Sequence, residues 1–260
     1  MMTGDQPLLS ARGLTKHFGD RVACRDISFD LWPGEALAIV GESGSGKTTL
    51  IKCLSMQLEA SSGTVAYRGR DGIDRDLAAM GEAERRMLMR TDWGFVHQDA
   101  REGLRMGVSA GANVGERLMA VGDRHYGRIR SSAADWLARV EIDPDRIDDS
   151  PWRFSGGMRQ RLQIARVLVS KPRLVFMDEP TGGLDVSVQA RLLDLLRSLV
   201  RNLGLAAIIV THDLAVARLL TDRIMVMKGG EVVEEGLTDQ VLDDPHHAYT
   251  QLLTSSVLTV

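Results

Sequence analysis

The chain has 260 residues, 44% of them hydrophobic and 26% charged, which is ordinary for a soluble globular protein and enough to bury a substantial core. Its formal net charge of -3 gives no support for a nucleic-acid partner, because such a partner requires a basic surface. Apolar runs fall short of the roughly 18 residues that a membrane span needs, and the N-terminal MMTGDQPLLS lacks the basic and apolar regions of a signal peptide. We therefore expect a cytoplasmic protein without direct membrane insertion.

The two cysteines, Cys24 and Cys53, suggest a reducing compartment. Neither belongs to a CxxC pair, and Cys53 lies within an apolar helical stretch. We expect both to be packing residues, the alternative being that they are metal ligands.

The N-terminal part of the chain predicts a small antiparallel sheet. Short apolar runs alternate with turn signals over residues 7–40, and the last run, ALAIV at 36–40, has branched side chains without polar alternation, as in a buried strand. Phe18 falls at a loop position within this region, where an aromatic ring can stack on adenine. The alternative is that Phe18 is an ordinary core residue.

The sequence GESGSGKTT at 41–49 matches a phosphate-binding loop. It lies between the predicted strand at 36–40 and a segment of helical periodicity, which is the context that this motif requires. Its glycines allow backbone N–H groups to turn inward at a helix N-terminus, Lys47 places a charge on the outer phosphates, and the Thr48 hydroxyl is a ligand for magnesium. The alternative is a glycine-rich turn that only caps a helix. The loop consists of Gly41, Glu42, Ser43, Gly44, Ser45, Gly46, Lys47, Thr48 and Thr49.

The middle of the chain changes from strand signals to helical ones. After a strand at 64–69 and a charged helical segment at 82–90, the run WGFVHQ predicts a strand at 93–98 that ends in Gln98. An amide side chain there can face a nucleotide's metal ion and the attacking water; the alternative is an ordinary polar loop residue. From about 101 to 149 the periodicity predicts a helical insertion between two halves of a sheet domain.

A second glycine turn opens a predicted helix within residues 153–169. Ser155, Gly156 and Gly157 provide another helix N-terminus that can bind an anion. Because serine is also a common N-cap residue, the alternative is a cap without a ligand.

Two adjacent carboxylates follow the apolar strand LVFM. Asp178 can hold magnesium through its water shell, and Glu179 can accept a proton from water that attacks the outer phosphate. Such a pair is weak evidence alone, but nucleotide hydrolysis needs both a phosphate cradle and a metal-and-base site at the carboxyl ends of parallel strands. The two motifs together therefore predict nucleotide hydrolysis.

The C-terminal part predicts a helix at 187–202 and a core strand at 206–211, which ends at His212. Beside the hydrolysis site this histidine can sense the terminal phosphate; the alternative is a structural histidine. Two short strands, RIMVM and EVVEEG, precede a final piece in which the pair His246-His247 is expected to lie in a loop rather than to bind a metal.

These motifs, in this order, resemble those of the ATP-binding-cassette ATPases over essentially the whole chain. The resemblance implies an α/β fold of the P-loop NTPase type, with a mixed, largely parallel core sheet, a small antiparallel β subdomain and an inserted α-helical subdomain. Residues 1–260 would form one domain, with the nucleotide-binding core in 1–100 and 151–235, the helical subdomain at about 101–150 and a C-terminal helical extension at 236–260.

The same resemblance implies an ATPase that uses ATP and Mg²⁺ and works as a head-to-tail dimer. The second cassette, in a homodimer or a heterodimer, would complete the site with its signature turn, and Asp185 would end the dimer loop. Two features depart from the family pattern: the signature has Phe154 and Met158 in place of leucine and glutamine, and the loop after Glu179 contains TGGLD. We still expect ATP to bind, whereas the hydrolysis rate is left open.

Within the family, the stretches FSGGMRQRLQIAR and GERLMA resemble the cassette subunits of bacterial carbon-phosphorus lyase systems. This implies a soluble ATPase that docks, through about residues 101–125, on the core subunits of a phosphonate-degrading enzyme. The runner-up is the ATP-binding subunit of an oligopeptide or nickel importer, which the runs GGLDVSVQARLLDLLR and DPHHAYTQLL resemble. A third interpretation is an adaptor that binds ATP without productive turnover.

Overall fold

The computed structural model describes residues 6–257. These form two compact units, one from the residues up to Glu82 together with those from Val200 onward, and one from Ala83–Leu199. Every helix in the described part of the chain is too short or too polar to cross a membrane.

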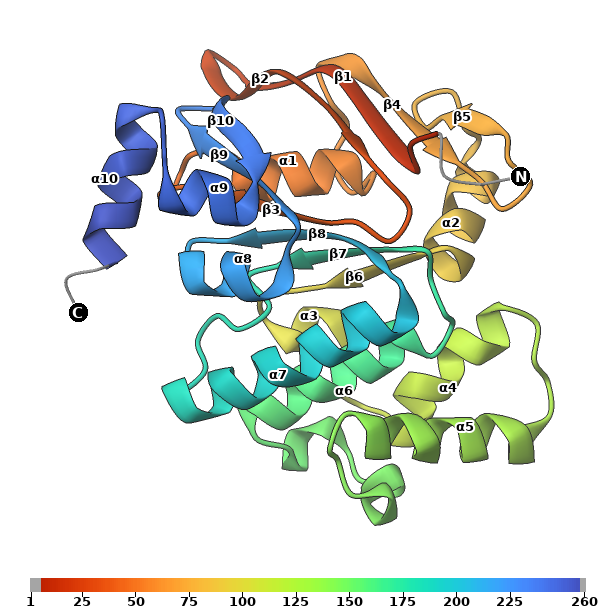
Figure 1. The fold of residues 1–260 in the computed structure, drawn as a ribbon. Coiled ribbons are helices and arrows are strands. Elements are labelled where there is room, and N and C mark those ends of the chain that lie inside the picture. Colours follow the sequence, from red (N-terminus) through yellow and green to blue (C-terminus); the bar gives the residue numbers. More distant parts are fainter. Residues whose placement is uncertain (1–5, 258–260) are drawn as a thin grey trace. The chain divides into compact units, whose positions relative to one another are not determined.

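The first unit contains the small antiparallel sheet that the sequence predicts, and the structure gives it four strands in the order β2-β1-β4-β5 (Figure 1). Leu9 at the start of β1 pairs with Leu31 of β2 on one side and with Tyr67 of β4 on the other. Phe18, predicted to lie in a loop, is instead the last residue of β1, where it pairs with Arg21. The strands are β1 (Leu9–Phe18), β2 (Arg21–Leu31), β4 (Ser62–Arg68) and β5 (Asp74–Asp76).

The same unit contains a mixed sheet centred on β3 (Ala36–Val40), which runs parallel to β8 (Ala206–Thr211) and β9 (Arg223–Lys228). The hairpin strand β10 (Glu231–Leu237) is antiparallel to β9. All residues of β3 and β8 are buried, which explains why both appear in the sequence as uninterrupted apolar runs. The helices of this unit are α1 (Lys47–Leu54), α8 (Leu214–Leu220), α9 (Thr238–Asp243) and α10 (Ala248–Val257).

The second unit is built on a parallel pair of strands, β6 (Trp93–Val96) and β7 (Leu174–Asp178). Residues 101–149, all within the described chain, contain helices and turns but no strand, as predicted. The predicted strand at 93–98 ends two residues early, at Val96, because side chains rather than a strand partner bind the backbone of His97. The helices are α2 (Glu82–Thr91), α3 (Ala100–Gly103), α4 (Ala110–Ala120), α5 (Tyr126–Arg139), α6 (Gly156–Leu168) and α7 (Val186–Leu203), with short 3-10 helices at Pro144–Asp148 and Pro151–Arg153.

The two cysteines lie in the core of the first unit, as predicted for packing residues. Burial raises the pKa of Cys24 to about 12 and that of Cys53 to about 11. The Cys24 thiol lies 3.6 Å from the carbonyl oxygen of Gly46, so it packs directly behind the phosphate loop.

His246 and His247 donate their backbone N–H groups to the Glu234 carboxylate at 2.8 and 3.0 Å, in the turn before α10.

One partly buried arginine joins the two sheets of the first unit. Arg223, the first residue of β9, places its guanidinium 2.7 Å from the carboxylate of Glu35 and 3.1 Å from that of Glu235, and it donates to the carbonyl oxygen of Asp30 in β2. Burial raises the pKa of Glu35, and Arg223 opposes this effect by favouring the carboxylate. The planar, multiply donating guanidinium suits this position between three acceptors.

Replacing Arg223 with methionine should lower the free energy of unfolding by about 3 kcal/mol, because the partly buried Glu35 would lose its cationic partner. Urea unfolding followed by circular dichroism measures the change. The matched control is Arg218→Met, which removes an ion pair to Asp243 between two largely exposed side chains and should cost less than about 1 kcal/mol. Equal losses in the two variants would contradict this role for Arg223.

Candidate nucleotide site

The phosphate loop follows β3 and is closely packed against neighbouring backbone. Gly41, Gly44 and Gly46 have φ angles of 150°, 83° and 104°, a region that other residues rarely adopt. A Cβ at Gly41 would lie 2.2 Å from the carbonyl oxygen of Met227, and one at Gly46 would lie 2.1 Å from that of Ala23. These two glycines are therefore required by space as well as by conformation.

Positive charge is held at the start of the helix that follows. Lys47, the first residue of α1, is buried, and its ammonium donates to the carbonyl oxygens of Gly41 and Glu42 at 2.7 and 2.8 Å. The first turn of α1 contains no acidic residue that would offset the helix dipole. The Ser45 hydroxyl is buried without a hydrogen-bond partner among the described residues. A lysine held across a glycine loop at a helix N-terminus fits the phosphates of a nucleotide.

A residue that the sequence interpretation missed, Tyr249, contacts this loop. The backbone N–H of Glu42 donates to the Tyr249 hydroxyl at 2.9 Å, and the ammonium of Lys228 lies 4.8 Å from the centroid of the tyrosine ring. Tyr249 belongs to α10 and is buried. The C-terminal helix thus supports the phosphate loop and occupies one of its N–H groups.

Two further predicted site residues lie in the first unit. The side chain of Phe18 is 50% exposed, so the alternative of a core residue is wrong, and Lys16 lies 5.2 Å from its ring centroid. His212 follows β8 and is exposed. Next to it, Asp213 caps α8 by accepting the N–H of Ala215 at 2.8 Å.

In the second unit, the structure brings Gln98 to the turn that carries the two carboxylates. Asp178 is the buried last residue of β7. Glu179 has φ 47°, a strained conformation for a residue with a side chain, and its carbonyl oxygen accepts the N–H of Gly182 at 2.9 Å. A Cβ at Gly182 would lie 3.2 Å from the amide nitrogen of Gln98, so this glycine of the TGGLD loop leaves room for the glutamine.

The serine-glycine turn caps its own helix and packs against the start of α7. The Ser155 hydroxyl accepts the N–H of Met158 at 3.2 Å, as in an ordinary N-cap. A Cβ at Gly157 would lie 2.4 Å from the side chain of Val188, which shows that this glycine permits the close approach of the two helices. Asp185 directly precedes α7 and is exposed.

The unusual signature residues share a partner that the sequence interpretation missed. The guanidinium of Arg146 lies 4.6 Å from the ring centroid of Phe154 and 3.5 Å from the sulfur of Met158. Its hydrogen bond to Asp149, at 2.7 Å, lowers the pKa of that carboxyl group. Phe154 is buried, so the two unusual signature residues are accommodated by apolar and cation-π packing.

The predicted site residues therefore fall into two groups, each described within its own unit. The first unit carries Phe18, the phosphate loop and His212, and the second carries the residues at the turns and strand ends, which are Gln98, Ser155, Gly156, Gly157, Asp178, Glu179 and Asp185.

The chain belongs to the ABC transporter family, whose model matches residues 24–182, and it is an ATPase of this class. It is 65% identical to the putative phosphonates utilization ATP-binding protein PhnK of Escherichia coli (strain K12), over 98% of this chain and 99% of that protein. It is 37% identical to the dipeptide transport ATP-binding protein DppF of the same organism, over 98% of this chain and 77% of that protein.

Solved structures of ABC cassettes have the same fold. A dimeric cassette, MJ0796, bound to ADP and Pi in a post-hydrolysis state, has a TM-score of 0.78 and 29% identity, covering 88% of this chain and 98% of that one. The cassette cbiO1 from Clostridium perfringens, part of an ABC transporter complex, has a TM-score of 0.75 and 29% identity over 92% of each chain. The α/β cassette fold and the capacity to bind ATP follow from these matches.

Two glycines of the phosphate loop should respond differently to alanine. Gly46→Ala combines a strained φ with a backbone clash and should lower the free energy of unfolding of the nucleotide-free protein by about 3 kcal/mol or more. Gly44→Ala has open space around the new Cβ and should cost only about 1 kcal/mol from backbone strain. Urea unfolding without nucleotide tests this difference, which would be absent if the loop were loosely packed.

Proposed function

We propose that this chain is the ATP-hydrolysing subunit of a carbon-phosphorus lyase system, in which it acts as one half of a head-to-tail pair of cassettes during phosphonate catabolism. The observation that carries this proposal is the 65% identity, over nearly the whole chain, to a protein named for phosphonates utilization, against 37% to a dipeptide transport subunit.

On the phosphate side of the site, the N–H groups of the loop and the Lys47 ammonium bind the outer phosphates of ATP. Mg²⁺ prefers oxygen ligands, which Thr48, Gln98 and Asp178 would supply. Asp178 is buried, and a buried carboxylate suits a divalent cation better than a carboxylate on the solvated surface. Magnesium held by these residues would neutralise charge on the phosphates. Phe18, exposed at the end of β1, stacks on the adenine ring.

For hydrolysis, Glu179 accepts the proton of the attacking water and Gln98 orients that water. The strained backbone of Glu179 supports this role, because such conformations persist at sites where a side chain must point in one direction. His212, at the end of the parallel strand next to β3, senses the terminal phosphate.

The second cassette completes the site. Ser155, Gly156 and Gly157 present the N-terminus of helix α6. The exposed Asp185 directly precedes helix α7. A pair of cassettes, either two copies of this chain or this chain with a homologue, would place this turn on the triphosphate held by the opposite loop. The dimeric structures of MJ0796 support a paired assembly.

Two substitutions separate binding from hydrolysis. Lys47→Ala should abolish ATP binding, whereas Glu179→Gln should retain binding and lower kcat by at least about 100-fold, because it removes only the general base. Isothermal titration and phosphate release measure the two quantities. Lys52→Ala, on the same helix α1, is the control and should change neither. Wild-type hydrolysis by Glu179→Gln would refute the assignment of the base.

The partner is tested by purifying the Glu179→Gln chain from its native cytoplasm with ATP present and identifying the proteins bound to it. Soluble carbon-phosphorus lyase subunits are the expected result. An integral membrane permease in their place would favour the second candidate, an importer subunit. The 37% identity to the dipeptide transport subunit supports that candidate. That result would overturn the proposed system while leaving the assignments at the nucleotide site intact.

A further inference from the structure

Two buried side-chain amides hold the backbone of the segment 97–105 at its two ends. Each forms what we call an amide clamp, in which one side chain bonds both the N–H and the C=O of a single residue. The first is Gln163 of α6, whose side-chain oxygen accepts the N–H of His97 at 2.7 Å and whose nitrogen donates to the His97 carbonyl oxygen at 3.1 Å. Gln163 is fully buried. Strand β6 ends at Val96, and Gln163 bonds the backbone of the next residue in place of a neighbouring strand.

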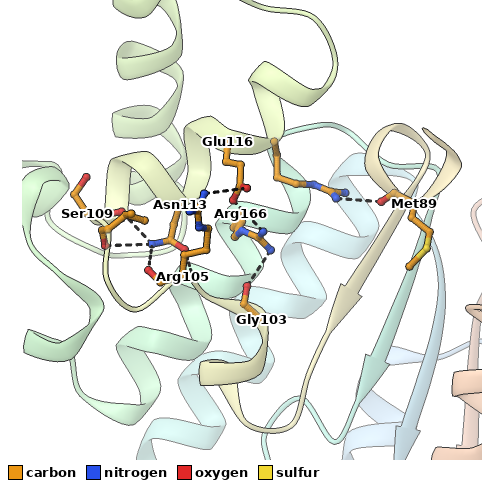
Figure 2. Close-up of polar contacts among 9 residues, drawn as sticks. Met89, Gly103, Arg105, Ser109, Asn113, Glu116 and Arg166 are labelled. Atoms are coloured by element: carbon orange, nitrogen blue, oxygen red, sulfur yellow. Dashed lines mark hydrogen bonds and ion pairs between the residues drawn. The ribbon is translucent and has the colours of Figure 1, made fainter. Parts of the chain in front are cut away.

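The second amide clamp is Asn113 of α4, which is also fully buried. Its side-chain oxygen accepts the N–H of Arg105 at 2.8 Å, and its nitrogen donates to the carbonyl oxygens of Arg105 and Ser109 at 3.0 Å each (Figure 2). Breaking either clamp would leave backbone groups without partners in the protein interior, which costs more than the net gain from an average hydrogen bond. Both ends of the segment are therefore strongly fixed.

The middle of the segment is bonded to the same two helices. Arg166 donates to the carbonyl oxygen of Gly103 at 2.9 Å and pairs with Glu116 of α4 at 3.2 Å, and Glu116 in turn lies 3.3 Å from the guanidinium of Arg105 (Figure 2). A Cβ at Gly103 would lie 2.0 Å from the side-chain oxygen of Gln163, so the glycine lets the first clamp reach His97. The segment is therefore also bound at Gly103, between its two ends.

The polar side chains of α6 that make these contacts occupy one face of the helix. Gln160, Gln163 and Arg166 recur at every third residue, the spacing at which side chains on a helix are neighbours. Gln160 also donates to the His97 carbonyl oxygen, at 3.1 Å, and accepts from Gln163 at 3.2 Å. Arg166 is thus part of a polar contact surface, not of a solvated helix face. Strand β6 is held to α4 as well, because Arg117 donates to the carbonyl oxygen of Trp93 at 2.6 Å.

The first clamp acts on the residue immediately before Gln98. The Gln98 side chain is exposed and lies beside Gly182, in the turn that begins with Glu179. Fixing both polar groups of His97 restricts the two peptide planes that set the direction of Gln98. Without Gln163, the His97 N–H would lose its acceptor, and the His97 carbonyl oxygen would keep only the bond from Gln160. The peptide before His97 could then turn, and the direction of Gln98 would change with it.

We propose that Gln163 is a positioning residue for Gln98 in ATP hydrolysis, and that the Asn113 clamp fixes the far end of the same segment. This rests on the role of Gln98 given above. A displacement of about 1 Å at a reacting group can cost on the order of 100-fold in rate, so a clamp one residue away is close enough to matter. Gln163 bonds to the backbone of His97 and to the side chain of Gln160, so it would act on Gln98 through the backbone.

The test compares Gln163→Met, which keeps the length of the side chain and removes both hydrogen bonds, with Gln98→Ala and the double variant. Gln163→Met should lower kcat at least tenfold while leaving the dissociation constant for ATP within about twofold. In the Gln98→Ala background it should cause no further loss of kcat, because residues that act through one group are not additive. Gln163→Glu should lie between wild type and Gln163→Met, because burial favours the protonated carboxyl group, which can accept from the His97 N–H and donate one hydrogen bond.

A readout independent of activity is hydrogen-deuterium exchange of nucleotide-free protein, followed in a peptide that spans residues 93–104. The His97 amide should exchange faster in Gln163→Met than in wild type. The matched control is Ile164→Val, on the same helix and fully buried, which should lower stability slightly without changing kcat or this exchange.

Several results would overturn the positioning role. These are unchanged exchange at His97, a loss of kcat that adds to that of Gln98→Ala, or an equal loss in Ile164→Val. A slow Gln98→Ala variant combined with wild-type kcat in both Gln163 variants would reject the role of Gln163 alone. Full activity of Gln98→Ala would reject the role of Gln98 in hydrolysis and the inference with it.

Discussion

The phosphate loop depends on the approach of backbone to backbone at two glycines. The carbonyl oxygen of Ala23 in β2 lies where a side chain at Gly46 would be, and that of Met227 in β9 lies where one at Gly41 would be. The loop is therefore shaped by both sheets of the first unit, and Arg223 bonds these sheets to each other. Tyr249 adds support from the C-terminal helix. A rigid cradle of this kind spends no binding energy on ordering itself around phosphate.

In the second unit, the predicted site residues Gln98 and Glu179 follow the ends of two short strands, β6 and β7. Backbone groups beyond a strand end have no ladder partner, and buried polar groups must find one. After β6 the partners are side chains of α4 and α6, so these two helices determine the path of the segment 97–105. The strained Glu179 and the side-chain-free Gly182 belong to the same turn, where they set the backbone direction at the proposed base and leave space beside it.

Much of the fold could be predicted from periodicity. The fully buried strands β3 and β8 were predicted to the residue, because buried parallel strands appear as unbroken apolar runs between turn signals. Helix α7 differs from its prediction by one residue at each end. The predicted end of β6 was wrong, because the backbone of His97, the next residue, bonds to side chains more than 60 positions away along the chain. Phe18 was assigned to a loop because its pairing with Arg21 depends on the hairpin register.

The sequence by itself determined the family and the order of the motifs, and it predicted the residue types for phosphate, metal and base, because each motif is a short stretch whose chemistry depends on local spacing. Only the tertiary structure decided how those residues are held. Gln163, Asn113, Arg146 and Tyr249 act through contacts between segments far apart in the chain, and each appears in the sequence as an ordinary helix or loop residue. A hydrogen bond between distant segments depends on where the backbone brings them together, and no local pattern encodes that distance.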